Sequence, residues 1–158
     1  MSKNQALQDL LDQYKSGELN ADAAAEAIEG LRLDQIGNFA CMDLGRDVRC
    51  GMPEVVLAEG KDPSHLTTIA IRHAQAAGRC VVTRIGREQV RPIRESADRA
   101  GITTEYHEAG HILVLSTGPG PEKNGGVVAV ITAGTSDIRV AEEARIIAEE
   151  MGCEVRTA

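Results

Sequence analysis

The sequence predicts a mixed α/β fold, and three observations lead to this prediction. Strand-like and helix-like segments alternate between residues 54 and 116, and a strand–turn–helix–strand pattern follows between residues 127 and 156. Hydrophobic residues make up 42% of the 158 residues, which is enough for a packed core. Only Tyr14, Phe39 and Tyr106 are aromatic, so we expect a core of Ala, Val, Ile and Leu.

Residues 1–36 are expected to form a helical hairpin. Apolar residues recur at helical spacing at Leu7, Leu10, Leu11 and Tyr14, and Ser16-Gly17 ends that run. A second, Ala-rich helix is expected to begin at a cap formed by Asn20 or Asp22 and to end near Gly30. No side chain in this segment suggests chemistry, so we expect the hairpin to serve in docking or oligomerisation.

Residues 37–117 are predicted to form a small α/β domain. Pro63 and Ser64 are typical of the start of a helix, and Gly78 is typical of its end. The expected helices cover residues 63–77 and 88–100, and the expected strands cover residues 54–58, 80–84, 102–106 and 112–115.

The beginning of this domain is rich in charge. Asp43, Arg46, Asp47 and Arg49 lie among apolar residues, and the two arginines would share one face of a helix. A guanidinium group forms paired hydrogen bonds with phosphate or carboxylate. The spacing is compatible with two interpretations, which are a binding site for such a ligand and a solvated face of ion pairs.

Residues 118–126 are predicted to be a linker or exposed loop, because residues 117–126 contain four glycines and two prolines. Residues 127–158 are predicted to begin a second domain. The apolar run 127–132 is typical of a strand buried on both faces of a parallel sheet. A helix is expected over residues 138–151, with an inner stripe of Val140, Ala144, Ile147 and Met151. One crossover is too little for a doubly wound sheet, so we expect a fragment or a chain that borrows strands from a partner.

The best candidate site is the turn Gly134-Thr135-Ser136-Asp137, between the predicted strand and helix. Open α/β sheets bind ligands at the carboxyl edge of their strands. A helix N-terminus there offers free N–H groups and partial positive charge to a phosphate or carboxylate. Thr135 and Ser136 add hydroxyl donors, and Asp137 adds an acceptor or base. The same residue types are also ordinary helix caps, so a purely structural role is the alternative.

Residues 107–111 read H-E-A-G-H and match the zinc-protease pattern H-E-x-x-H. The flanking residues favour strands, on which the two imidazoles would lie about 13 Å apart. We therefore predict a hairpin turn at Ala109-Gly110 and no metal site. His65 and His73, on the predicted helix 63–77, are expected at the surface.

Charge and composition exclude several classes of function. The net charge of −7 disfavours nucleic acid and anionic membranes, which would repel the chain. No apolar run is long enough for a membrane helix, and the first residues lack the apolar core of a signal peptide. We expect a cytoplasmic protein whose four cysteines, Cys41, Cys50, Cys80 and Cys153, are free thiols.

Two motifs resemble one known family. They are F-A-x-x-D…R…R-x-G-x-P-E-V-V…E-G-K over residues 39–61 and V-I-T-A-G-T-S-D…V-A-E-E-A over residues 130–144. Both resemble the pyridinium-3,5-biscarboxylic acid mononucleotide synthases, which make the nickel-pincer nucleotide cofactor. The second domain of that family is similar to AIR carboxylase and has a flavodoxin-like parallel sheet. The resemblance covers most of residues 37–158, and its second motif is the more specific one.

The resemblance implies a carboxylase and hydrolase. Nicotinic acid adenine dinucleotide would be carboxylated on its pyridinium ring by CO₂ or bicarbonate, and cleavage of its phosphoanhydride would release AMP. A covalent cysteinyl adduct would make the electron-poor ring nucleophilic. Ser136 and Asp137 would be catalytic, with Gly134 and Thr135 binding substrate beside them. The first motif would contribute further substrate-binding residues at Asp43, Arg46, Arg49, Glu54 and Lys61.

The resemblance also implies a homo-oligomer without a covalently bound cofactor, and it leaves a role for Mg²⁺ open. Two departures from the family pattern stand out. The family's nucleophilic cysteine lies downstream of the residues present, so we expect this chain alone to be inert. Arg139 stands where the family usually has proline. The alternatives are an AIR carboxylase-like enzyme of purine synthesis and a non-enzymatic nucleotide-binding or regulatory module.

Overall fold

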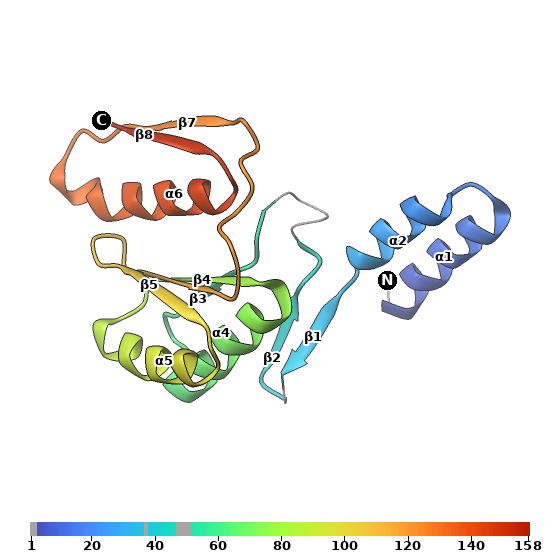
Figure 1. Cartoon of the computed structure of the whole chain (residues 1–158), viewed down its shortest axis with the longest axis horizontal. Coiled ribbons are helices and arrows are strands. Elements are labelled where there is room, and N and C mark those ends of the chain that lie inside the picture. The colour runs from blue at the N-terminus through green and yellow to red at the C-terminus, as the bar shows by residue number, and fades with distance from the viewer. Residues whose placement is uncertain (1–2, 37, 47–51) are drawn as a thin grey trace. The chain divides into compact units, whose positions relative to one another are not determined.

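The computed structural model describes residues 3–36, 38–46 and 52–158, and Figure 1 shows its elements. The chain divides into two compact units, residues 1–54 and residues 55–158. Each unit combines helices with a sheet, so the predicted mixed α/β class is confirmed. No helix within the described ranges is long and apolar enough to cross a membrane.

The described residues of the first unit form two long helices and a β-hairpin. Helices α1 (Lys3–Ser16) and α2 (Ala21–Glu29) are confirmed where the sequence predicts them. Asn20 caps α2, because its side-chain oxygen accepts the N–H of Ala23 at 2.8 Å. Strands β1 (Leu33–Ile36) and β2 (Ala40–Asp43) pair antiparallel. The sequence analysis did not anticipate β1, because four residues are too few to show a clear alternating pattern.

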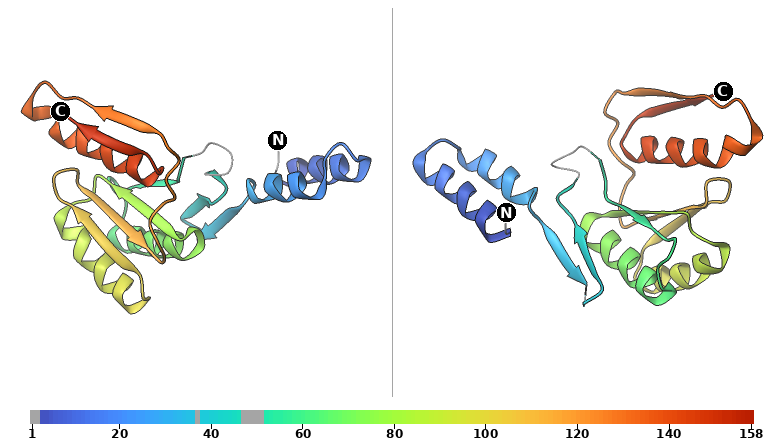
Figure 2. Two further views of the ribbon diagram at one scale, coloured as in Figure 1. Left: turned by 45° about the horizontal axis from the view of Figure 1, so that its top comes forward. Right: turned by 180° about the vertical axis from the view of Figure 1, so that it is seen from behind.

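The second unit begins with a four-stranded sheet in the order β3-β4-β6-β5. Its strands are β3 (Val55–Leu57), β4 (Arg79–Thr83), β5 (Thr103–His107) and β6 (Ile112–Ser116). Strands β3 and β4 run parallel, and the other two pairings are antiparallel. Helices α4 (Pro63–Ala77) and α5 (Arg87–Arg99) follow β3 and β4 and lie against one face of this sheet, as the views in Figures 1 and 2 agree.

Local signals fix the ends of α4. Asp62 accepts the N–H groups of Ser64 and His65, and Gly78 ends the helix in the left-handed region with φ of 81°. The expected surface position of His73 is wrong, because this side chain is only 3% exposed. Leu66, Ile69, Ala70 and Ala74 are buried with it at helical spacing, so His73 lies on the inner face of α4.

The unit ends with a β-α-β segment that confirms the predicted pattern. Strands β7 (Val127–Val130) and β8 (Glu154–Thr157) pair parallel, and α6 (Ile138–Glu150) connects them. Helix α6 lies over the face of the four-stranded sheet opposite α4 and α5 (Figure 2). Ile146 on α6 is buried in one cluster with Val81, Ile112 and Val114 of that sheet.

Two burial predictions for this segment are wrong. Val140, placed on the inner stripe of α6, is 65% exposed, and Ala144 is exposed too, whereas Ile146 is buried. The helix is therefore rotated so that its innermost side chain meets the four-stranded sheet. The residues of β7 are not buried on both faces, since Val127 is 60% exposed. The reason is that β8 is the sole strand beside β7 in the described part of the chain.

Candidate functional site

The turn from Gly134 to Asp137 connects β7 to α6. Gly134 is extended, with φ of −149° and ψ of 156°, and Thr135–Asp137 form a short 3-10 turn that leads into α6. The N–H of Asp137 donates to the carbonyl oxygen of Gly134 at 3.1 Å, and Ser136 Oγ donates to Asp137 Oδ1 at 3.4 Å. All four residues are exposed, so the turn presents two hydroxyls, one carboxylate and its backbone to solvent.

A cavity of about 310 Å³ lies at the carboxyl ends of β7 and β8, and its lining includes Thr132 before this turn and Ile138 after it but none of residues 134–137. A hydrogen bond from the N–H of Thr132 to the carbonyl oxygen of Ala158, at 3.1 Å, continues the strand pairing into its wall. The cavity is lined by residues from the two strand ends and from the first turns of α6, which are Val130, Thr132, Ile138, Ala141, Glu142, Thr157 and Ala158. Ligands of open α/β sheets bind at this edge. The sequence analysis missed Thr132, Glu142 and Thr157, although their places after a strand or in the first turns of a helix could have indicated them.

The cavity carries one fixed negative charge. Arg145 donates hydrogen bonds to Glu142, with 2.8 Å between Nη2 and Oε2, and these bonds hold the pKa of Glu142 below its usual value. Arg145 also pairs with Glu149 at 2.7 Å. Glu142 therefore stays ionised at neutral pH, where it accepts hydrogen bonds and has no proton to give.

The residues of the first predicted motif lie mostly in the first unit. Arg46 and Glu54 form an ion pair with 3.5 Å between Nη1 and Oε2, and their side chains are 42% and 27% exposed. The structure thus brings two predicted substrate-binding residues together. Asp43 is half-buried at the end of β2. Arg49 lies outside the described residues.

Lys61 belongs to the second unit and is exposed in the turn that follows β3. Its N–H donates to the carbonyl oxygen of Ala58 at 3.1 Å. Within the described ranges, no hydrogen bond or ion pair joins Lys61 to the turn 134–137. Lys61 therefore follows a strand of the four-stranded sheet, whereas the turn 134–137 follows a strand of the β7–β8 sheet.

The H-E-A-G-H segment forms the tip of the β5–β6 hairpin, which confirms the predicted turn at Ala109-Gly110. His107 is the last residue of β5 and lies opposite Ile112. His111 adopts a left-handed conformation with φ of 53°, and its Nδ1 lies 3.3 Å from the carbonyl oxygen of Ile85. A zinc-protease motif needs a helix here. Throughout the described residues, no three His, Cys, Asp or Glu side chains gather in a way that could hold a metal ion.

Three cysteines lie within the described residues, and all are free thiols, as predicted. Cys41 is exposed, Cys80 is buried and Cys153 is half-buried. Asn124 Nδ2 approaches the sulfur of Cys153 at 3.5 Å. Cys50 lies outside the described residues.

Comparison with known proteins supports the resemblance. A family model described as the LarB/PurE-like N-terminal domain matches residues 33–117, which include β1 to β6. An uncharacterized protein of Methanocaldococcus jannaschii is 30% identical over 161 residues. That alignment covers 100% of this chain and 61% of the relative. The chain therefore spans about three fifths of the length of the relative that it matches.

Proposed function

The chain belongs to the family of LarB/PurE-like N-terminal domains, and from this membership we propose that it acts in a nucleotide carboxylase. The proposed reaction carboxylates the pyridinium ring of nicotinic acid adenine dinucleotide with CO₂ or bicarbonate. Hydrolysis of the phosphoanhydride then gives pyridinium-3,5-biscarboxylic acid mononucleotide and AMP. The substrate and both steps rest on the similarity of the two sequence motifs to that family.

One observation carries the proposal, which is the place of the turn 134–137. It lies beside the 310 Å³ cavity at the carboxyl ends of two parallel strands, and it leads into a helix of 13 residues. Asp137 makes no side-chain cap of α6, so its carboxylate does not occupy the N-terminus of that helix, which is the end that favours a phosphate. A Cβ at Gly134 would lie 3.7 Å from Ser136 Oγ, an ordinary contact, so packing does not require this glycine. Glycine instead leaves room for a ligand to approach the backbone.

We assign separate roles to the residues of the turn. Ser136 Oγ would donate a hydrogen bond to a phosphate oxygen, and Thr135 and Gly134 would line its approach. In the carboxylation, a thiolate adds to the ring and a ring carbon then attacks CO₂. That carbon must lose its proton before the thiolate leaves and the ring becomes aromatic again. Asp137 is our candidate for the base that takes this proton.

By the resemblance, none of the four cysteines of this chain matches the nucleophilic cysteine of the family. Cys80 is buried on strand β4, and Cys153 is half-buried beside Asn124. We therefore expect these 158 residues alone to bind the nucleotide but not to turn it over.

Magnesium fits this scheme as an ion that arrives with the phosphates. Mg²⁺ is commonly held by one or two carboxylates together with substrate phosphates, which requires no cluster of protein ligands. Asp137 is the carboxylate of the turn that such an ion would meet. When bound, the ion would offset phosphate charge during hydrolysis.

A binding titration tests the proposal. Nicotinic acid adenine dinucleotide is titrated into the chain by calorimetry, with and without Mg²⁺. Ser136→Ala should weaken binding about 10-fold, the loss expected from one charge-assisted hydrogen bond. Asp137→Asn should weaken binding only when Mg²⁺ is present, because it removes the carboxylate that the ion would meet. The matched controls Ser64→Ala, at the start of α4, and Asp98→Asn, on α5, should bind like the parent. Equal affinity in all five proteins would contradict the proposed site.

The same titration with mononucleotides separates the alternatives. Binding of an aminoimidazole ribonucleotide in preference to the dinucleotide would favour an AIR carboxylase-like enzyme. Equal binding of several mononucleotides, with no preference for the pyridinium compound, would favour a nucleotide-binding module.

A further inference from the structure

One face of α6 meets the four-stranded sheet through three residues on successive turns. They are Glu142, Ile146 and Glu150, spaced four residues apart, so they form a single stripe. Ile146 occupies the centre of the stripe and is 1% exposed. An acidic residue on each side of one isoleucine is unusual for a buried helix face, because each carboxylate needs a partner.

Glu142, the first residue of the stripe, packs against Gly110. This buried glycine belongs to the H-E-A-G-H turn between β5 and β6. A Cβ added there would lie 3.2 Å from Cβ of Glu142 and 3.4 Å from the backbone nitrogen of Glu143. The hairpin therefore approaches α6 so closely that a side chain at position 110 would make the neighbouring atoms shift by a few tenths of an ångström. His107, at the base of the same hairpin, is near enough to act electrostatically on Glu142.

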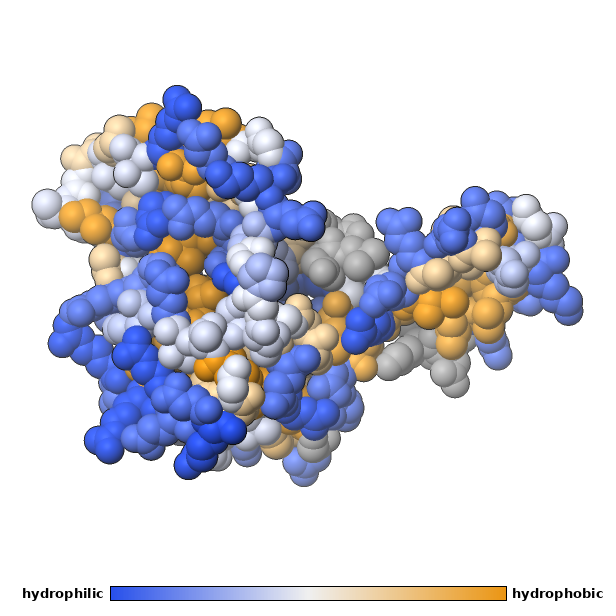
Figure 3. All heavy atoms as spheres, in the orientation of Figure 1, coloured by the Kyte–Doolittle hydropathy of each residue, from blue (hydrophilic) through white to orange (hydrophobic). Residues whose placement is uncertain are grey.

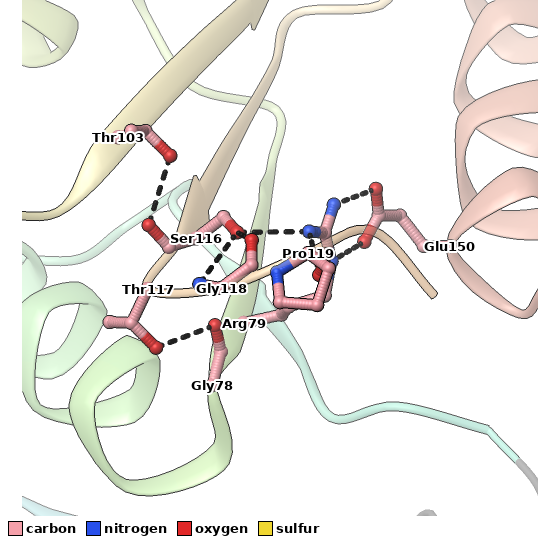
Figure 4. Close-up of polar contacts among 8 residues, drawn as sticks. All are labelled: Gly78, Arg79, Thr103, Ser116, Thr117, Gly118, Pro119 and Glu150. Atoms are coloured by element: carbon pink, nitrogen blue, oxygen red, sulfur yellow. Dashed lines mark hydrogen bonds and ion pairs between the residues drawn. The ribbon is translucent and has the colours of Figure 1, made fainter. Parts of the chain in front are cut away.

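Glu150, the last residue of the stripe, binds Arg79, as Figure 4 shows. Its guanidinium group forms two hydrogen bonds with Glu150, Nε to Oε2 and Nη2 to Oε1, each 2.6 Å long. The remaining nitrogen, Nη1, donates to Ser116 Oγ at 3.0 Å and to the carbonyl oxygen of Pro119 at 3.4 Å. The two charged side chains are 26% and 11% exposed, so solvent screens the pair less than a surface pair.

We infer that Arg79 and Gly110 are positioning residues, which dock α6 on the sheet and thereby hold the turn 134–137 in place. The close approach at Gly110 lies nearer the turn, the buried Ile146 lies at the middle and the Arg79–Glu150 pair lies at the far end. With three attachments along its length, α6 cannot tilt or rotate without breaking at least one of them. The ligand held by the turn rests on the proposed function, but the docking of α6 does not.

Hydrogen–deuterium exchange of the full 158-residue chain tests the docking. Arg79→Gln should raise the exchange of α6 amides about 10-fold, the effect expected from losing charge-assisted hydrogen bonds, and leave α4 and α5 unchanged. Gly110→Val should do the same from the other end of the helix. The matched control is Arg91→Gln, which breaks an exposed ion pair with Glu95 on α5. It should leave α6 exchange as in the parent.

A variant in which the two charges are swapped distinguishes a specific role in docking α6 from a general contribution to the stability of the unit. The double variant Arg79→Glu with Glu150→Arg should recover at least half of the lost protection in α6. Unchanged α6 exchange in Arg79→Gln, or equally faster exchange in α4, α5 and α6, would overturn the inference. Affinity for nicotinic acid adenine dinucleotide is measured on the same proteins. If the parent does not bind it, the proposed function fails, while the exchange data still decide whether Arg79 and Gly110 dock α6.

Discussion

Single glycines mark where two backbones of this protein meet most closely. Gly45 lies against the backbone of Gly30, and a Cβ at position 45 would overlap the carbonyl oxygen there. The N–H of Gly45 donates to the carbonyl oxygen of Arg32 at 3.2 Å, which ties the residues after β2 to the residue before β1. Gly45 therefore holds the two halves of the first unit together by having no side chain.

We predict that Gly45→Ala destabilises the first unit by about 1–3 kcal/mol, because the new methyl group must displace backbone. Hydrogen–deuterium exchange of α2 and β2 measures the effect without requiring the two units to unfold together. Gly118→Ala is the matched control, since nothing lies within 4 Å of a Cβ there. Equal protection in the two variants would show that the contact between Gly45 and Gly30 is not tight.

Asp62 provides a second prediction, which concerns pH. The hydroxyl of Ser64 and the N–H groups of His65 and Ser64 hold the pKa of Asp62 below its ordinary 3.8. The ionised cap therefore stabilises α4 above that pH, and this stabilisation is lost as the pH falls through the folded-state pKa. Asp62→Asn keeps an acceptor oxygen but cannot titrate.

In thermal unfolding, the parent should have a higher midpoint than Asp62→Asn at neutral pH, and the gap should shrink below pH 3.8. Asp98→Asn, on the exposed face of α5, removes a carboxylate without removing a cap and should show no such pH dependence. A gap between parent and Asp62→Asn that stays constant with pH would mean that the charge of the cap contributes nothing.

Helices and strands with strong local signals could be predicted from the sequence, and those without could not. Pro63 and Gly78 mark both ends of α4, and the predicted range agrees with the observed one. Strand β1 has no such marks. The stripe of α6 was predicted wrongly because apolar periodicity favours Val140 over Ile146 as the innermost residue. Which of the two is buried depends on the sheet beneath the helix, and that sheet comes from distant sequence.

Part of the candidate site could likewise be predicted from the sequence, and part could not. The turn 134–137 could be predicted because four consecutive residues carry its chemistry. The cavity beside it could not, because it joins Thr132 to Thr157 across two strands. The pairing of Arg79 with Glu150 spans 71 residues, and neither residue belongs to a recognisable motif. The role of Gly110 was hidden by the resemblance of its segment to a zinc motif.

At the scale of the whole molecule, two of the described segments each expose several apolar side chains. Leu7, Leu11 and Ile28 of the α1–α2 hairpin are between 38% and 48% exposed, and apolar atoms are visible on that hairpin in Figure 3. Around β7 and α6, Val127, Ile131 and Val140 are 60%, 77% and 65% exposed. Both outer edges of the β7–β8 pair are also unpaired within the described part of the chain. Unpaired edges and apolar patches are the usual sites of protein association.

We therefore predict that the chain self-associates through the β7–α6–β8 segment. In sedimentation velocity, the parent should sediment faster as its concentration rises. The double variant Val127→Lys with Val140→Glu leaves net charge unchanged and should stay monomeric across the same range. The control pair Gln75→Lys with Ala76→Glu, on an exposed part of α4, should behave like the parent. A parent that is monomeric at every concentration would contradict the predicted oligomer.

The docking of α6 also has a consequence in time. The sheet that receives the helix is complete at Ser116, whereas Glu150 lies 71 residues after Arg79. Chains grow at about 5–20 residues per second, so roughly 4–14 s separate the synthesis of these two charges. A small mixed domain can fold within milliseconds to seconds. We expect the sheet to form first and α6 to assemble on this finished surface. During each round of translation, Arg79 would then be in place on the sheet before Glu150 is synthesised.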